Sequence, residues 1–251
     1  MDPVVDDLAA QQAELESVLD GLSAAQWGVP TRCAGWDVAD VVLHLAQSDE
    51  LALGSVTGRL ADVALGLAGG EGPAGTVDEG ADALVTRQRG AAPAELVGRW
   101  ASGAARLVEA LAAMDLSTRV PWVTGALSAR SLATTRLAET WIHAGDVADA
   151  VGVELPPTDR LRQIARLAWR TLPYAFGSAG RDMSGPVAFR LVGPDGSPWE
   201  LVPDEPPLTT VRGPAAELCA VAARRTPASA TTLHGEGPDV DAVLELVRTY
   251  A

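Results

Sequence analysis

Apolar residues recur at helical spacing through most of the first 151 residues of the chain. Between residues 3 and 23 they fall three or four positions apart and leave an acidic outer face, which is the pattern of an amphipathic helix. The same spacing predicts a second helix over residues 38–65, a helical stretch over 77–89, and long helices over 93–114 and 129–151. Four long helices joined by loops predict a helical bundle.

The pattern changes after the last of these helices. Two β-rich runs flank the turn Pro194-Asp195-Gly196, an arrangement typical of a hairpin. We therefore expect two domains, a four-helix bundle of residues 1–155 and a small α+β domain of residues 156–251. The other elements expected in the second domain are helices over residues 158–178, 213–225 and 239–250 and a short strand over 230–233.

The charge of the chain narrows the classes of partner. The net charge is −14 and the isoelectric point is about 4.5, and the acidic excess lies almost entirely in residues 1–155. Nucleic acids and anionic membranes need clustered cations, so we expect neither as a partner. All nineteen basic residues are arginine, a composition typical of a GC-rich genome such as that of an actinobacterium.

Cysteine usage and the N-terminal sequence indicate a cytoplasmic protein. Cys33 and Cys219 lie far apart and form no CxxC motif, so we expect reduced thiols rather than a disulfide framework. The N-terminus is acidic and lacks the pattern of a signal peptide. No apolar run is long enough to cross a membrane. We expect a monomer or a homodimer that acts on a small molecule.

Two of the three histidines lie within apolar helical stretches, and one of them has a glutamate beside it. His44 falls in the second helix, whereas Glu139 and His143 lie one turn apart on one face of the fourth long helix. Zinc accepts imidazole and carboxylate ligands, and three protein ligands leave one position open for water or substrate. The same residues also fit a hydrogen-bonded core histidine and an ordinary helix side-chain pair. The spacing alone does not show whether His44 faces the other two.

Asp146 and Cys33 are further candidates near these residues. Asp146 follows His143 by three positions, so it is a candidate to orient the imidazole or to accept a proton in catalysis, although a solvated residue or an ion pair fits equally well. Arg136, three positions before Glu139, is a candidate to neutralise that glutamate without a metal. Cys33 has no base beside it in the sequence, which favours a small buried thiol over a nucleophile.

Two segments of the sequence, taken together, resemble a known family. They are WGVPTRCAGWDVADVVLHLA, residues 27–46, and ALSARSLATTRLAETWIHAGDVADAVG, residues 126–152. They resemble the mycothiol-dependent maleylpyruvate isomerase family, whose N-terminal part is a DinB-like metal-binding four-helix bundle. The stretches LVGPDGSPWEL and TLHGEGPDVDAVLELV are similar to the smaller C-terminal domain of that group.

The resemblance implies a divalent metal, most often zinc, held by His44, Glu139 and His143. It also implies mycothiol, a low-molecular-weight thiol, as a cosubstrate whose sulfur takes the open position at the metal. The thiolate adds to an electron-poor double bond, which becomes a single bond. In an isomerase this bond rotates, and loss of the thiol then gives the trans isomer. Other relatives transfer the thiol instead. The expected function is therefore isomerisation of, or S-transfer to, a small electrophile.

Two other functions fit the same residues. A zinc hydrolase that uses no thiol would need the same three ligands, because zinc-bound water is a nucleophile near neutral pH. A non-catalytic DinB-like scaffold or binding protein would need the bundle but no reactive site. Removal of low-molecular-weight thiols distinguishes the thiol-dependent enzyme from the hydrolase, and substitution of His44 tests the scaffold.

Overall fold

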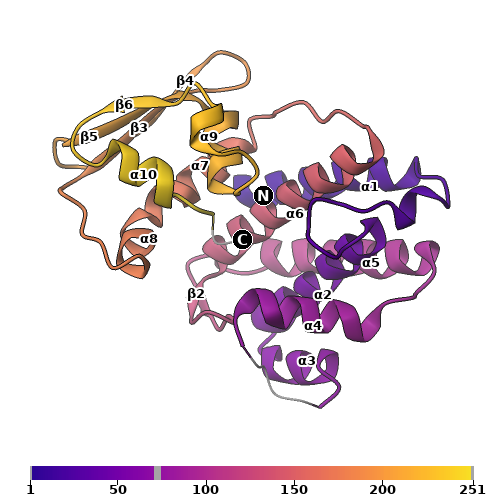
Figure 1. The fold of residues 1–251 in the computed structure, drawn as a ribbon. Coiled ribbons are helices and arrows are strands. Elements are labelled where there is room, and N and C mark those ends of the chain that lie inside the picture. Colours follow the sequence, from indigo (N-terminus) through magenta and orange to yellow (C-terminus); the bar gives the residue numbers. More distant parts are fainter. Residues whose placement is uncertain (1, 71–74, 250–251) are drawn as a thin grey trace. The chain divides into compact units, whose positions relative to one another are not determined.

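The computed structural model describes residues 2–70 and 75–249. The chain divides into two compact units, and the division falls between Leu155 and Pro156. The first unit is built mainly from helices, whereas the second combines helices with a four-stranded sheet (Figure 1). The fold class expected from the sequence is therefore confirmed. That each unit folds as an independent domain stays a prediction.

Four long helices form the bundle of the first unit. They are α1 (Pro3–Asp20), α2 (Val38–Val56), α5 (Pro93–Ala112) and α6 (Ala129–Val151). Both α1 and α2 pack against α5 and α6, so each long helix has two neighbours. Side chains such as Leu8, Leu43, Leu107 and Leu137 are almost fully buried. Removal of this apolar surface from water is the main source of the bundle's stability.

The second predicted helix is shorter than the sequence indicates. The prediction of one helix over residues 38–65 is wrong, because α2 ends earlier and a separate short helix, α3 (Leu60–Leu67), follows. Gly58 lies between them with φ of 72°, a left-handed conformation that ends a helix. An added Cβ at Gly54 would lie 2.9 Å from a methyl group of Val63, so α3 packs closely against α2.

Short elements connect the long helices of the bundle. The helix α4 (Val77–Gln88) lies within the predicted stretch of residues 77–89. The predicted loop before α6 contains two short strands, β1 (Arg119–Val120) and β2 (Leu127–Ser128), which pair antiparallel. A 3-10 helix, η1 (Gln26–Gly28), lies in the loop between α1 and α2.

Polar side chains fix the ends of α2 and α6, the two helices that carry the candidate ligands. The Asp37 side chain accepts a hydrogen bond from the backbone N–H of Asp40, and the Asp40 side chain accepts one from that of Asp37. This capping box starts α2. Ser128 accepts from the backbone N–H of Ser131 at the start of α6, and Gly152, with φ of 74°, ends that helix. Both helices begin where the sequence predicted.

The sheet of the second unit has the strand order β4-β3-β5-β6. Its strands are β3 (Val187–Val192), β4 (Pro198–Leu201), β5 (Thr209–Pro214) and β6 (His234–Glu236). The strands β3 and β4 form the predicted hairpin, with Gly196 in its turn at φ of 83°, whereas β3 and β5 run parallel. The prediction of a strand over residues 230–233 is wrong, because the backbone N–H of Thr232 donates to the Glu217 side chain instead of to a strand.

The helices of the second unit also differ from the predicted ranges. They are α7 (Leu161–Arg170), α8 (Leu172–Ser178), α9 (Ala215–Ala222) and α10 (Val240–Leu246). The helix predicted over residues 158–178 is divided, and Pro173 lies in the first turn of α8, where its missing N–H breaks no hydrogen bond. The first residues of the helix predicted over 213–225 belong to β5. The prediction of a helix over 239–250 is wrong at its end, because α10 stops at Leu246 and residues 247–249 are not helical; residue 250 lies outside the described residues.

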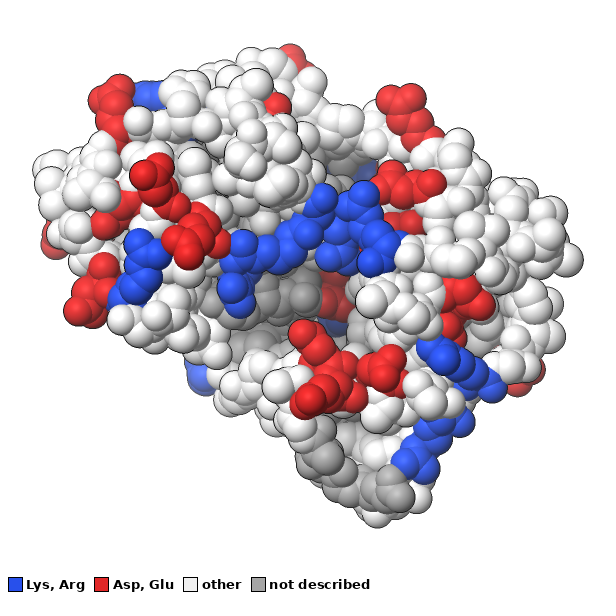
Figure 2. Space-filling view, in the orientation of Figure 1, with Lys and Arg blue, Asp and Glu red and all other residues white. Residues whose placement is uncertain are grey.

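The surface carries both signs of charge. Acidic and arginine side chains share the face drawn in Figure 2, where a band of arginine side chains touches acidic groups. Although the chain has a net charge of −14, the acidic side chains on this face do not form one continuous area. Within residues 2–70 and 75–249, no helix combines the length and the apolar character needed to cross a membrane.

Candidate metal centre

His44, Glu139 and His143 come together between two helices of the bundle. The helices α2 and α6 pack against each other, and His44 Nε2 lies 3.0 Å from Glu139 Oε2 although the two residues are 95 positions apart. His143 Nε2 lies 3.8 Å from the same oxygen. The two imidazole rings are 5.0 Å apart between centroids and meet edge to face at 75°. The three residues that the sequence singled out therefore form one group.

The spacing of these three residues suits a small divalent cation. One ligand atom of each lies within 4.8 Å of the others. Nitrogen and oxygen ligands bonded at about 2.0–2.1 Å to a tetrahedral zinc ion lie about 3.3 Å apart, and the two distances to Glu139, 3.0 and 3.8 Å, bracket that value. Both donor types are ones that zinc accepts. The residues therefore fit such an ion with small side-chain movements.

The three side chains are shielded from solvent but not closed off. Their exposed fractions are 14% for His44, 13% for Glu139 and 10% for His143. A carboxylate this deeply buried needs hydrogen bonds or a compensating charge. Solvent therefore still reaches a small part of each side chain.

A loop between η1 and α2 covers the imidazole of His44. The ring of Trp36 lies 5.0 Å from the His44 ring and is tilted by 44° to it. The indole N–H of Trp36 donates to Asp82 on α4 at 2.9 Å, and Arg89 donates to the backbone carbonyl of Gly35. Contacts from α4 and the residue after it therefore hold the loop, and with it the Trp36 ring, against His44.

Arg136 approaches Glu139 but binds more closely to another carboxylate. Its Nη1 lies 3.7 Å from Glu139 Oε2, whereas its Nε donates to Asp49 at 3.0 Å and its Nη2 to the Ser48 hydroxyl at 2.9 Å. Arg136 and Asp49 are almost fully buried and form an ion pair between α2 and α6. The sequence left open that Arg136 neutralises Glu139 without a metal. In the structure this contact, 3.7 Å long, is the longest of the three that Arg136 makes here.

The second ring nitrogen of His143 faces a carboxylate and a thiol. His143 Nδ1 lies 3.0 Å from Asp146 Oδ2, and Cys33 Sγ lies 3.3 Å from the same oxygen. Asp146 is almost fully buried, and Arg32 Nε lies 3.9 Å from its other oxygen. When neutral His143 donates its Nδ1 proton to Asp146, the lone pair of Nε2 faces the other two candidate ligands.

Cys33 is the residue of this site whose place the sequence did not indicate. Its sulfur lies 3.8 Å from Nδ1 of His143, a residue 110 positions away. Cys33 belongs to a loop, where no periodicity shows which way a side chain points. The backbone N–H of Cys33 donates to the Thr31 hydroxyl. The polar side chains beside the Cys33 sulfur come from α6, so no local sequence pattern reveals them.

Burial and neighbouring charges set the protonation of the three candidate ligands. Burial acts to raise the pKa of Glu139, but the hydrogen bond with His44 and the surrounding positive charges hold that pKa well below its ordinary value. Burial lowers the pKa of His44 and outweighs the attraction of Glu139. Burial also acts to lower the pKa of His143, but its contacts with Asp146 and Cys33 and the nearby carboxylates raise it to about 9. Without a cation, His143 is therefore protonated at neutral pH.

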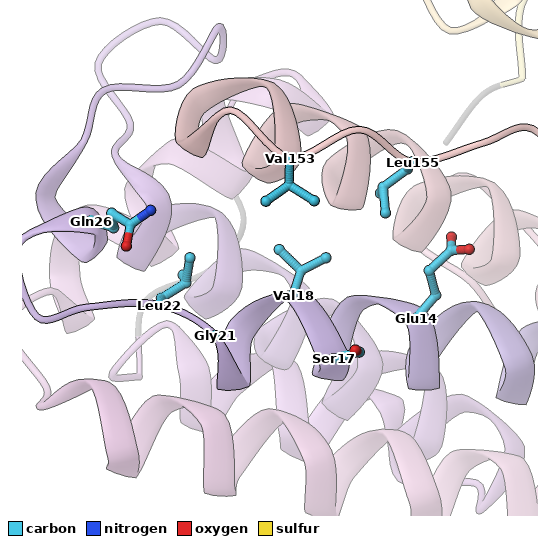
Figure 3. Close-up of a pocket in the computed structure, with 8 residues that line it drawn as sticks. All are labelled: Glu14, Ser17, Val18, Gly21, Leu22, Gln26, Val153 and Leu155. Atoms are coloured by element: carbon cyan, nitrogen blue, oxygen red, sulfur yellow. The ribbon is translucent and has the colours of Figure 1, made fainter.

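A separate groove of about 380 Å³ lies between the end of α1 and the segment after α6 (Figure 3). Val18, Leu22, Val153 and Leu155 give it mainly apolar walls, and Glu14 is its acidic residue. Val18 and Val153 point toward each other across it (Figure 3). Its lining includes none of the candidate cation ligands, so it adds no donor to the group on α2 and α6.

The chain is similar to known proteins over nearly all its length. The model of the mycothiol maleylpyruvate isomerase N-terminal domain matches residues 8–148. Two uncharacterized proteins of Mycobacterium tuberculosis, from strains CDC 1551 / Oshkosh and ATCC 25618 / H37Rv, are each 36% identical over 250 residues, which is 99% of this chain and 95% of theirs. Crystal structures of a mycothiol-dependent maleylpyruvate isomerase and of a mutant of it share the fold, with a TM-score of 0.62 and 20% identity over 95% of each chain. The chain therefore belongs to the mycothiol maleylpyruvate isomerase family.

Proposed function

We propose that the protein is an enzyme that uses a low-molecular-weight thiol, namely mycothiol. With it the enzyme isomerises a small electrophilic substrate or transfers the thiol to that substrate. One observation carries the proposal: His44, Glu139 and His143 converge from two helices with their ligand atoms at cation spacing. Family membership supports the choice of thiol. We propose a divalent cation, zinc by its ligand preferences, at these three residues.

Each residue of the group has a separate role in this proposal. His44 and His143 supply neutral nitrogen ligands, and Glu139 offsets part of the positive charge. Asp146 is a positioning residue, because it holds the Nδ1 proton of His143 and so fixes the tautomer. A bound divalent cation would supply a positive charge that lowers the pKa of a thiol beside it and favours the thiolate. A role for Asp146 as the acceptor of the thiol proton stays a prediction.

A thiolate formed at this place has two possible outcomes with an electron-poor alkene. Sulfur adds to one alkene carbon, and the double bond becomes a single bond that is free to rotate. In isomerisation the C–S bond then breaks, the double bond is restored in the trans geometry and the thiolate is released. In S-transfer the C–S bond remains and the adduct takes up a proton. Isomerisation therefore regenerates the thiol, whereas S-transfer consumes it.

We also propose a cytoplasmic location, where a reduced thiol cosubstrate is available. In the described part of the chain Cys33 and Cys219 are thiols rather than disulfide-bonded. Cysteines that form no disulfide are typical of a reducing compartment.

An assay of thiol balance tests the proposal and separates its two reactions. The purified protein is given zinc, mycothiol and either maleylpyruvate or an aryl halide such as chlorodinitrobenzene, from which the thiolate displaces chloride to form an aryl thioether. NMR follows the alkene geometry, and a thiol-reactive dye follows the thiol. We expect turnover that needs both zinc and thiol, is lost in Glu139→Gln and is kept in the exposed control Asp149→Asn.

Two results would contradict the proposed function. Turnover that is unchanged when all low-molecular-weight thiol is removed would support the thiol-independent zinc hydrolase instead. A protein that binds zinc in stoichiometric amount but turns over no electrophile of either class would support the non-catalytic scaffold.

A further inference from the structure

A second group of cation ligands lies at the other edge of the His143 ring. The sulfur of Cys33, Nδ1 of His143 and a carboxylate oxygen of Asp146 all lie within 4.8 Å of one another. The sulfur is 3.3 Å from Asp146 Oδ2 and 3.8 Å from Nδ1, and Nδ1 is 3.0 Å from Oδ2. In a tetrahedral zinc site with a Zn–S bond of about 2.3 Å, sulfur lies about 3.6 Å from a nitrogen or oxygen ligand. The three observed distances are close to those of a three-ligand zinc site, so small side-chain movements would let the group hold such an ion.

We propose that Cys33, His143 and Asp146 form a second cation site, selective for thiophilic divalent ions, which competes with the first group for His143. A neutral imidazole has one lone pair and one N–H, so one nitrogen at a time binds a cation. A cation on Nδ1 moves the ring proton to Nε2, and the first group then loses a ligand. The second site stands on its own contacts, whereas the competition rests on the proposed function.

The donor types of the two groups differ in softness. The first group offers two imidazoles and a carboxylate, whereas the second offers a sulfur, which prefers soft ions such as Cd²⁺ and also binds Zn²⁺. When the cation-free protein binds the ion, the Cys33 thiol and Nδ1 of the His143 ring each lose a proton to the solvent, and metal–sulfur and metal–nitrogen bonds form in place of the S–H and N–H bonds. No electrons are transferred. Hard ions such as Mg²⁺ gain nothing from the sulfur and are not expected here.

An arginine borders the second group on the side of Asp146 that faces away from the thiol. Arg32 Nε is 3.9 Å from Asp146 Oδ1, the oxygen that does not face the thiol, and its Nη2 pairs with Asp149 at 3.2 Å. The side chain of Arg32 is 44% exposed, so the group lies close beneath the surface loop. In the second unit, the buried thiol of Cys219 donates to a backbone carbonyl.

Cobalt(II) spectroscopy on a variant without the first group tests the second site directly. His44→Ala removes a ligand of the first group only. We expect one equivalent of Co²⁺ to give a near-ultraviolet thiolate-to-cobalt charge-transfer band in His44→Ala. The band should persist in His44→Ala/Cys219→Ser and vanish in His44→Ala/Cys33→Ser. Absence of the band in folded His44→Ala, with folding checked by circular dichroism, would overturn the second site.

A displacement experiment on the full protein tests the competition. Protein loaded with one equivalent of Zn²⁺ is titrated with Cd²⁺, and released zinc is measured with a fluorescent zinc indicator. Wild type should release zinc at a Cd²⁺ concentration at least about tenfold lower than Cys33→Ser, with a cadmium–thiolate absorption rising in parallel. Equal release from both proteins would overturn the competition. If His44→Ala gives the cobalt band but Cys33→Ser binds no zinc, the second site is supported and the first group is rejected.

Discussion

At the scale of single residues, the two ring nitrogens of His143 face different partners. Nε2 lies 3.8 Å from Glu139, and Nδ1 lies 3.0 Å from Asp146. A carboxylate that accepts the Nδ1 proton selects the tautomer in which Nε2 is a ligand. In the proposed first group, Asp146 would therefore act on cation binding through His143, without touching the cation held there.

Asp146→Asn should weaken cation binding. The amide keeps the size of the carboxylate but loses its charge, so it holds the Nδ1 proton of His143 less firmly. Loss of such a partner typically costs about 10–100-fold in metal affinity, and we expect that loss for zinc in chelator competition at pH 7. The matched control is Asp149→Asn, whose side chain is 63% exposed and pairs with Arg32. Equal zinc affinities in the two variants would refute a positioning role for Asp146.

The affinity for a divalent cation should rise with pH. In the cation-free protein the pKa of His143 is raised to about 9 from an ordinary value of 6.5, so the ring must lose a proton before Nε2 binds. We expect zinc affinity to rise about tenfold per pH unit between about pH 7 and pH 9 and then to level off. Competition with a chromophoric chelator measures this, and a flat profile over that range would argue against His143 as a ligand.

The same pKa shift makes the stability of the cation-free protein depend on pH. A histidine with a raised pKa stabilises the fold fully below its unfolded value of about 6.5, and this contribution is lost as the pH rises through about 9. We expect the melting temperature of the chelated protein to fall over this window. His143→Gln, which has no titrating ring, should remove the fall; a fall of the same size in that variant would assign it to another group.

The sequence could predict the three candidate ligands of the first group but not how the whole candidate site is assembled. His44, Glu139 and His143 stand out because polar side chains are rare on apolar helices, and helical periodicity places two of them on one face. That His44 faces them depends on how α2 packs on α6, which no local pattern encodes. Cys33 was missed for a similar reason, since its partners lie 110 and 113 positions away.

At the scale of elements, a glycine inside α6 and the glycine that follows it should respond to alanine in opposite directions. Gly152 ends the helix with φ of 74°, a conformation that costs an L-residue about 1 kcal/mol or more, so Gly152→Ala should destabilise the protein by about that amount. Gly145 lies inside the helix with open space around an added Cβ, so Gly145→Ala should stabilise it by about 0.5–1 kcal/mol. Urea unfolding of both variants measures the two changes, and equal signs would contradict this explanation of the cap.

The buried pair of Arg136 and Asp49 should show strong coupling between α6 and α2. Among the described residues, Asp49 Oδ2 has no hydrogen-bond partner, and burial raises the pKa of Asp49 against the attraction of Arg136. Arg136→Met leaves a buried carboxylate without its partner and should cost about 3–5 kcal/mol of stability. The double variant Arg136→Met/Asp49→Leu should recover most of that loss. Additive costs in this double-mutant cycle would show that the pair contributes no coupling.

Helix starts were easier to predict than helix ends and strand pairings. Asp37, Pro93 and Ser128 mark starts because each supplies a cap or a proline that suits the first turn. The end of α2 was missed because the apolar period continues on both sides of Gly58. The strand β5 was missed because it is stabilised by a parallel neighbour, β3, whose pairing is not local in the sequence.

At the scale of the whole molecule, every candidate cation ligand belongs to the first compact unit. The division between Leu155 and Pro156 leaves both ligand groups within residues 1–155. We expect a chain that ends at residue 155 to fold, judged by helical circular dichroism and cooperative unfolding, and to bind zinc as tightly as the full protein. A fragment that is folded but binds zinc at least about tenfold more weakly would show that the second unit supports the site.

Anomalous diffraction from a crystal of the zinc-loaded protein, recorded at the zinc absorption edge, tests the central claim most directly. We predict a peak bonded to His44 Nε2, to the Glu139 carboxylate and to His143 Nε2, at about 2.0–2.2 Å from each. A map without a peak at that position, in a crystal whose His44 ring is turned away from Glu139, would contradict the metal centre and with it the proposed thiol chemistry.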